Sequence, residues 1–143
     1  MRKKRDGGYL ISQIHQLSGR IFTKKLKDYH IDINHAQGRI IFALWKKDQI
    51  PINDLSKETA LSKSSLTTML ERLEKSGHII RVQSEIDKRI TIVCLTPKSS
   101  SLRNDYQEIS ESMIDLFYKD FTEEEISQFE LSLKKVLKNL KNE

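Results

Sequence analysis

The sequence predicts a mostly α-helical fold that carries one small β-hairpin. Apolar residues recur at intervals of three and four along most of the 143 residues, which is the spacing of helices with one buried face. There are only two prolines and five glycines, so few residues interrupt these stretches. Residues 79–84 and 89–96 depart from the pattern, because they are short runs rich in β-branched side chains.

The first two predicted helices precede the centre of the chain. Residues 9–30 place an apolar stripe on one helix face, formed by Leu10, Ile14, Leu17, Ile21 and Leu26. Asn34 and Gln37 form a helix-start signal, because the Asn side chain can accept from a first-turn amide while the Gln reaches back. The helix that follows is apolar and is predicted to end near Asp48.

Two short helices joined by a turn follow. Pro51 suits the start of the first, over residues 52–59, where its missing amide costs nothing. Ser62 caps the second, which extends to about Ser76, and Gly77 lies where a left-handed cap is favoured. We predict that the leucines of the second helix face inward: Leu66, Leu70 and Leu73.

The outward face of that second helix is polar. It carries hydroxyls and two basic groups: Lys63, Ser64, Ser65, Thr67, Thr68 and Arg72. A helix fits the DNA major groove, and hydroxyls bond phosphates or either kind of base edge, so they position the helix more than they specify sequence. Arg72 is the best candidate for bidentate guanine recognition.

The two β-rich runs are predicted to pair as a hairpin around the turn at residues 85–88. The tip carries Asp87, Lys88 and Arg89, and basic groups at a hairpin tip suit phosphates or the minor groove. A hairpin that follows a helix-turn-helix is a wing. Residues 35–96 are therefore predicted to form a winged helix-turn-helix domain that binds double-stranded DNA.

Two further helices are predicted after the wing. Thr96 and Pro97 form a cap and first-turn pair, and Thr122 with Glu125 forms a capping box for the last helix. Both helices carry apolar stripes. We expect residues 1–34 and 97–143 to build a helical dimerisation region, because a small central domain cannot bury so many stripes. The predicted dimerisation residues are Leu10, Ile14, Leu17, Ile21, Phe129, Leu133, Val136 and Leu140.

Charge and composition narrow the class of protein. The net charge is +5, with residues 1–96 net positive and residues 97–143 net negative, and a positive field favours nucleic acid. The longest apolar run, Ile40–Trp45, is far shorter than the roughly 20 residues of a membrane helix. The basic N-terminus lacks the apolar core of a secretory signal. We expect a cytoplasmic protein with no membrane association.

The residues quoted above resemble the MarR family of transcriptional regulators. The resemblance extends over nearly the whole chain, and it is carried by DLSKETALSKSSLTTMLERLEKSGHIIR and by DKRITIVCLT. It implies a homodimer that usually represses genes. A twofold dimer would place two DNA-binding helices about one DNA turn, roughly 34 Å, apart and predicts a pseudo-palindromic operator. The resemblance further implies that Arg89 enters the minor groove while Asp87 holds it in place, and that a small-molecule effector often releases the DNA.

Other functions fit the sequence less well. No two histidines have the spacing that presents two ligands on one helix face, so no metal or other cofactor is expected. Cys94 lies in a predicted strand and is expected to be an inert structural thiol. No nucleotide-binding loop or nucleophile motif indicates an enzyme. The alternative is a winged-helix protein-interaction module without direct DNA binding, which would more often place apolar residues at Arg89 and on the hydroxyl-rich face.

Overall fold

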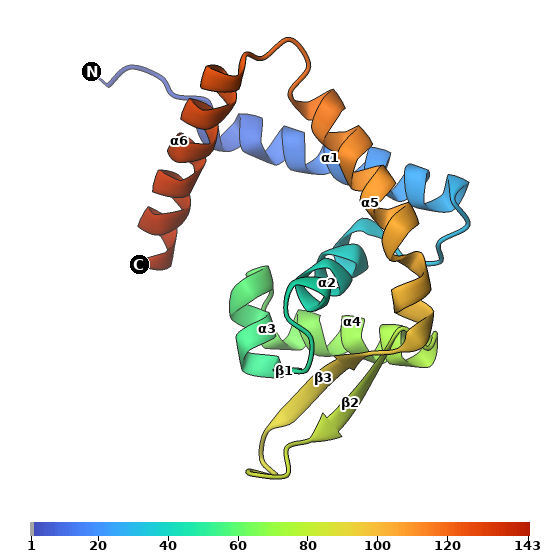
Figure 1. Cartoon of the computed structure of the whole chain (residues 1–143). Helices are drawn as coiled ribbons and strands as arrows, with labels where there is room; N and C mark the ends of the chain where they lie inside the picture. The colour runs from blue at the N-terminus through green and yellow to red at the C-terminus, as the bar shows by residue number, and fades with distance from the viewer. Residues whose placement is uncertain (1) are drawn as a thin grey trace. The chain divides into compact units, whose positions relative to one another are not determined.

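The computed structural model describes residues 2–143 and is mostly helical, with one small sheet (Figure 1). The elements are α1 (Gly7–Asp28), α2 (His35–Lys46), β1 (Ile50–Pro51), α3 (Ile52–Thr59), α4 (Lys63–Lys75), β2 (Ile79–Gln83), β3 (Thr91–Leu95), α5 (Pro97–Phe117) and α6 (Glu123–Lys141). They form two compact units, Met1–Ile109 and Ser110–Glu143. Within residues 2–143, no helix is long and apolar enough to cross a membrane.

The apolar faces of the short central helices pack together to form the core of the first unit. Leu66, Leu70 and Leu73 of α4 are completely buried, as their spacing predicts. Leu55 of α3 and Leu44 of α2 are buried with them. Each buried leucine contributes roughly 1.5–3 kcal/mol relative to an exposed one, so this core fixes which face of α4 remains outside.

The predicted helix-start signals are confirmed. The Asn34 side chain accepts from the Gln37 amide at 2.9 Å, and the Gln37 side chain accepts from the Asn34 amide at 2.9 Å. Ser62 caps α4 by accepting from the Ser65 amide. Gly77 has a φ of +83°, the left-handed conformation predicted for the residue after the helix.

The sheet contains one strand more than the hairpin predicted from the sequence. Its strand order is β1-β3-β2, and both pairs are antiparallel. Ile50 pairs with Val93 and Pro51 with Ile92, so the residues before α3 form an edge strand of two residues. The prediction missed β1 because a strand of two residues has no periodicity, and because one of them is a proline.

Two helix starts add detail to the predictions. α1 begins at Gly7, two residues before the segment whose apolar stripe predicted the helix. Thr96 directly precedes α5, and its carbonyl accepts from the Ser100 amide at 3.3 Å. Its hydroxyl donates to the Gly77 carbonyl at 2.5 Å, which joins the end of β3 to the turn after α4.

An aromatic cluster joins α1, α2 and α5 within the first unit. The Tyr106 ring lies 5.3 Å from that of Phe22 and 4.9 Å from that of Trp45, measured between centroids. Gly38 of α2 allows Tyr106 to approach closely, because a Cβ built on Gly38 would lie 2.7 Å from the Tyr106 hydroxyl oxygen. Any side chain at this position must displace the ring.

We expect Gly38→Ala to lower the free energy of unfolding by roughly 1–3 kcal/mol, because overpacking a tight core forces side chains off their rotamers. Equilibrium unfolding in urea measures this change. The matched control is Gly8→Ala, since nothing lies within 4 Å of a Cβ there and alanine favours a helix. Equal stability of the Gly38→Ala and wild-type proteins would contradict the packing described for Tyr106.

The second unit contains the end of α5 and the whole of α6. Thr122 and Glu125 form the predicted capping box, with hydrogen bonds of 2.9 and 3.1 Å. The Tyr118 hydroxyl donates to the Glu130 carboxylate at 2.7 Å, and this bond raises the pKa of Tyr118 to about 12. No residue of α6 is buried.

Candidate nucleic-acid interface

The N-terminal half of α4 presents a row of hydroxyl groups to solvent. Ser64, Ser65 and Thr68 are exposed and Thr67 is half-buried. The Thr67 hydroxyl donates to the Lys63 carbonyl at 2.8 Å, and the Thr68 hydroxyl donates to the Ser64 carbonyl at 3.1 Å. Both threonine protons are thus used within the helix, so in this conformation these side chains offer acceptor lone pairs to a ligand.

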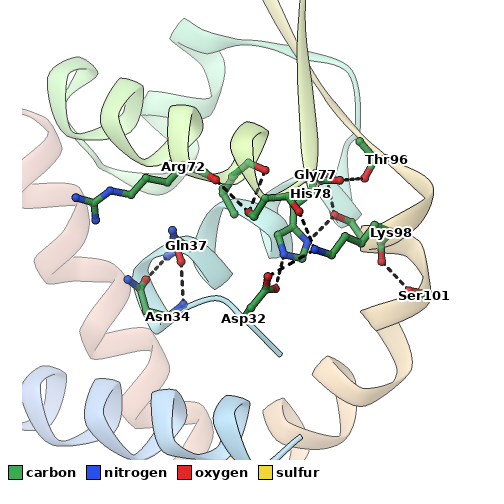
Figure 2. Close-up of polar contacts among 12 residues, drawn as sticks. Asp32, Asn34, Gln37, Arg72, Gly77, His78, Thr96, Lys98 and Ser101 are labelled. Atoms are coloured by element: carbon green, nitrogen blue, oxygen red, sulfur yellow. Dashed lines mark hydrogen bonds and ion pairs between the residues drawn. The ribbon is translucent and has the colours of Figure 1, made fainter. Parts of the chain in front are cut away.

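Arg72 lies further along α4 and is exposed. Figure 2 shows its side chain extending away from the polar contacts at the end of the helix. Its carbonyl oxygen accepts from the Ser76 amide and hydroxyl, each at 3.0 Å. The backbone of Arg72 is therefore held while the guanidinium projects outward.

The wing brings Asp87 and Arg89 into direct contact, as the resemblance implies. The Arg89 guanidinium donates from Nε to Asp87 Oδ1 at 3.1 Å and from an Nη atom to Oδ2 at 3.0 Å. The Arg89 amide also donates to Asp87 Oδ1 at 3.1 Å. The hydrogen bonds from Arg89 lower the pKa of Asp87 and raise that of Arg89, so both groups are charged at neutral pH.

The Arg89 side chain nevertheless remains 91% exposed, whereas that of Asp87 is 32% exposed. A bidentate contact to a carboxylate limits the rotamers of a long side chain without removing its outer face from solvent. Lys88, between them, is exposed as well. The predicted wing residues therefore form one exposed basic tip with a braced guanidinium.

A second ion pair, which sequence patterns did not predict, joins α4 to the wing. Glu74 accepts from the Arg81 amide at 3.0 Å through Oε2 and from the Arg81 guanidinium at 3.0 Å through Oε1. The side-chain hydrogen bond from Arg81 lowers the pKa of Glu74. The sequence shows opposite charges near the end of α4 and in the strand that follows, but only the fold brings the two side chains into contact.

Apolar side chains remain exposed in both units. On α1 these include Leu10, Ile14, Leu17 and Ile21, which are 38–54% exposed. On α6 Val136 is 43% exposed and Leu140 is 70% exposed, whereas Phe129 and Leu133 are half-buried. Leu10, Leu17 and Leu140 thus leave more than half of their surface in water in a single copy of the chain.

Three other features bear on ligand binding. Cys94 is half-buried, and burial with the nearby charge of Asp48 raises the pKa of its thiol, which disfavours the reactive thiolate. Among residues 2–143, no group of three or more His, Cys, Asp or Glu side chains is placed to hold a metal. An open hollow of about 360 Å³ lies between α1 and the start of α2, where His15, Arg20 and His35 line it.

Comparison with known proteins agrees with this geometry. Residues 33–91 match the model of the MarR family. The HTH-type transcriptional regulator SarZ of Staphylococcus aureus is 29% identical over 121 residues, which cover 85% of this chain and 74% of SarZ. The HTH-type transcriptional regulator YcgE of Bacillus subtilis is 38% identical over 74 residues, which cover 51% of this chain and 47% of YcgE.

Solved structures extend the similarity beyond the central domain. A mutant MarR from E. coli complexed with operator DNA superposes with a TM-score of 0.82 and 28% identity, over 91% of this chain and 92% of that one. The family model matches the segment with the helix-turn-helix and most of the wing, and the structural match includes the flanking helices. The chain is therefore similar to MarR-type winged helix-turn-helix transcriptional regulators, in residues 33–91 by sequence and over nearly its whole length by fold.

Proposed function

We propose that this protein is a homodimeric, sequence-specific DNA-binding repressor. The exposed guanidinium of Arg89, braced by both oxygens of Asp87, is the observation that carries the proposal. A cation held in one position loses little conformational entropy when it binds, so it suits insertion into a narrow, negatively charged groove. The E. coli MarR that resembles this chain was solved with operator DNA, which supports the same role here.

In this proposal α4 enters the major groove and the wing contacts the adjacent minor groove. The DNA-binding residues are Lys63, Ser64, Ser65, Thr67, Thr68 and Arg72 of α4, with Asp87, Lys88 and Arg89 of the wing. The hydroxyl acceptors suit the exocyclic amino groups of adenine or cytosine, and Arg72 suits guanine. Residues 35–96 act as the DNA-binding domain.

Residues 1–34 and 97–143 act as the dimerisation region. The exposed leucines and isoleucines of α1, and Val136 and Leu140 of α6, support this assignment, because burying them against a second copy removes apolar surface from water. A twofold dimer places two copies of α4 about one DNA turn, roughly 34 Å, apart. The operator is accordingly expected to be a pseudo-palindrome.

Repression and its relief by a small molecule complete the proposal. A dimer bound across a promoter blocks polymerase, and a ligand that favours another arrangement of the two DNA-binding domains releases it. The hollow between α1 and α2 is the place where we would first look for a bound effector. Transcription from a reporter promoter carrying the selected operator, with and without the protein, distinguishes repression from activation.

Arg72→Ala tests the role of α4. We expect the variant to lose roughly 1–3 kcal/mol of discrimination at one position in each half-site, because a bidentate contact to guanine is removed. Sequences selected from a random duplex library by the wild-type and variant proteins measure this. Lys75→Ala removes a charge from the same helix and is the matched control. A uniform loss of affinity across all sequences would make Arg72 a phosphate contact instead.

A further inference from the structure

His78 is buried where the α1–α2 connection, the turn between α4 and β2 and the first turn of α5 meet (Figure 2). Its Nε2 lies 2.8 Å from Oδ1 of Asp32, which belongs to the segment between α1 and α2. Its Nδ1 lies 3.5 Å from the hydroxyl oxygen of Ser99, in the first turn of α5. Since His78 is itself in the turn between α4 and β2, one imidazole touches all three segments.

The carboxylate of Asp32 also connects to the end of α4, the recognition helix of the proposed function. Lys98 Nζ lies 3.5 Å from Asp32 Oδ2 and donates to the Ser76 carbonyl at 2.7 Å. Ser76 in turn holds the carbonyl of Arg72. A chain of polar contacts therefore extends from the backbone of Arg72, through Ser76 and Lys98, to Asp32.

The base of the wing is fixed at the same turn. The Thr96 amide donates to the His78 carbonyl at 3.2 Å, and the Ser99 hydroxyl donates to that carbonyl at 2.6 Å. The first residues of α5 and the strand before them are thus attached to the turn that ends α4. The recognition helix and both strands of the wing share this one anchoring point.

Asp32 and His78 differ sharply in exposure. The His78 side chain is completely buried, whereas that of Asp32 is 58% exposed and that of Lys98 is 48% exposed. Partial burial acts to raise the pKa of Asp32, but its hydrogen bond to His78 and its electrostatic interactions with His78 and Lys98 outweigh this and lower it. The carboxylate is therefore ionised near neutral pH and is the solvent-accessible half of the contact.

We propose that Asp32 and His78, together with Lys98, form a latch that sets the relative position of the recognition helix and the wing for DNA binding. These are positioning residues, since the latch acts through Arg72 and Arg89 and does not itself touch DNA. The inference rests on the proposed function. Both arginines must reach the same duplex at once, so loosening their common anchor spreads them over positions that do not fit together.

The first test measures DNA affinity with Asp32→Ala. The probe is a fluorescent duplex that the wild-type protein selects from a random library. We expect binding to weaken roughly tenfold, because a charge-assisted hydrogen bond is lost from the anchor. Asp28→Ala, which removes the same charge from the exposed end of α1, should bind like the wild type. Equal affinity of Asp32→Ala and Asp28→Ala would overturn the latch.

A double-mutant cycle separates positioning from a general structural effect. If the latch positions the wing, Arg89→Ala weakens binding by a smaller factor in the Asp32→Ala background than in the wild type. Independent losses would show that Asp32 does not act through the wing and would contradict the proposal. If Arg89→Ala in the wild-type background had no effect, the proposed function would fail rather than the latch.

The second test requires no DNA. In ¹⁵N-labelled protein, long-range imidazole spectra report which nitrogen of His78 carries a proton. We expect a protonated Nε2 in the wild-type and Asp28→Ala proteins, because this nitrogen donates to Asp32, and a changed pattern in Asp32→Ala. An identical His78 signal in all three proteins would show that the contact does not govern the imidazole.

Discussion

Arg89→Ala is expected to abolish high-affinity DNA binding while leaving the oligomeric state unchanged. Arg89 is the most exposed member of the wing pair, and its guanidinium is already held in a defined position by Asp87. Charge-assisted hydrogen bonds contribute roughly 1.5–3 kcal/mol each. A dimer carries two wings, so the variant should bind at least roughly 100-fold more weakly in a gel-shift or anisotropy titration.

Two neighbouring variants make the test of Arg89 specific. Lys88→Ala removes an adjacent exposed charge that no carboxylate braces, and it should reduce affinity only slightly and mainly at low salt. Asp87→Ala keeps the Arg89 side chain but removes the carboxylate that holds it. Its loss of DNA affinity should lie between those of Lys88→Ala and Arg89→Ala. If Lys88→Ala and Arg89→Ala weakened binding equally, the wing would contribute net charge rather than a positioned contact.

Leu17→Glu is expected to convert a dimer into a monomer. Leu17 is 54% exposed on the stripe of α1 that we assign to dimerisation. Each dimer would then bury two carboxylates, and burying an unpaired charge costs several kcal/mol. Light scattering at micromolar concentration should give about twice the chain mass of 16.7 kDa for the wild type and the mass of a single chain for the variant.

Ser12→Glu is the matched control for Leu17→Glu. Ser12 is exposed, and at 100° per residue it lies on the opposite side of α1 from the apolar stripe. The Ser12→Glu variant adds the same charge outside the proposed interface. Its mass in light scattering should therefore equal that of the wild-type dimer. A single-chain mass for the wild-type protein would remove the dimer from the proposed function.

Local signals in the sequence predicted the helices and their ends well. The capping boxes at Asn34 and Thr122, the cap at Ser62 and the left-handed Gly77 depend on residues within four positions of one another. The inward face of α4 follows from the spacing of its leucines. Helix boundaries of this kind are set by hydrogen bonds and burial that a short segment specifies by itself.

The contacts that the sequence did not predict join distant residues. Asp32 and His78 are 46 positions apart, and only the packing of the first unit brings them together. Glu74 and Arg81 are seven positions apart, but Glu74 lies in α4 and Arg81 lies in β2, on the other side of a turn. The Asp87–Arg89 contact was anticipated through the family resemblance rather than from spacing. Sequence patterns therefore identified the exposed polar groups of α4 and of the wing better than the long-range contacts that hold these elements together.

The Glu74–Arg81 contact has a consequence for the behaviour of the protein in concentrated solution. β2 is an edge strand, and its exposed Ile80 and Val82 would suit pairing with a strand of another molecule. Pairing with another strand would need the Arg81 amide as a free donor, but this amide already donates to the Glu74 carboxylate. Glu74 also places a negative charge beside the edge of the strand. The Glu74 carboxylate, which joins α4 to the wing, thus also disfavours intermolecular strand pairing and aggregation at this edge.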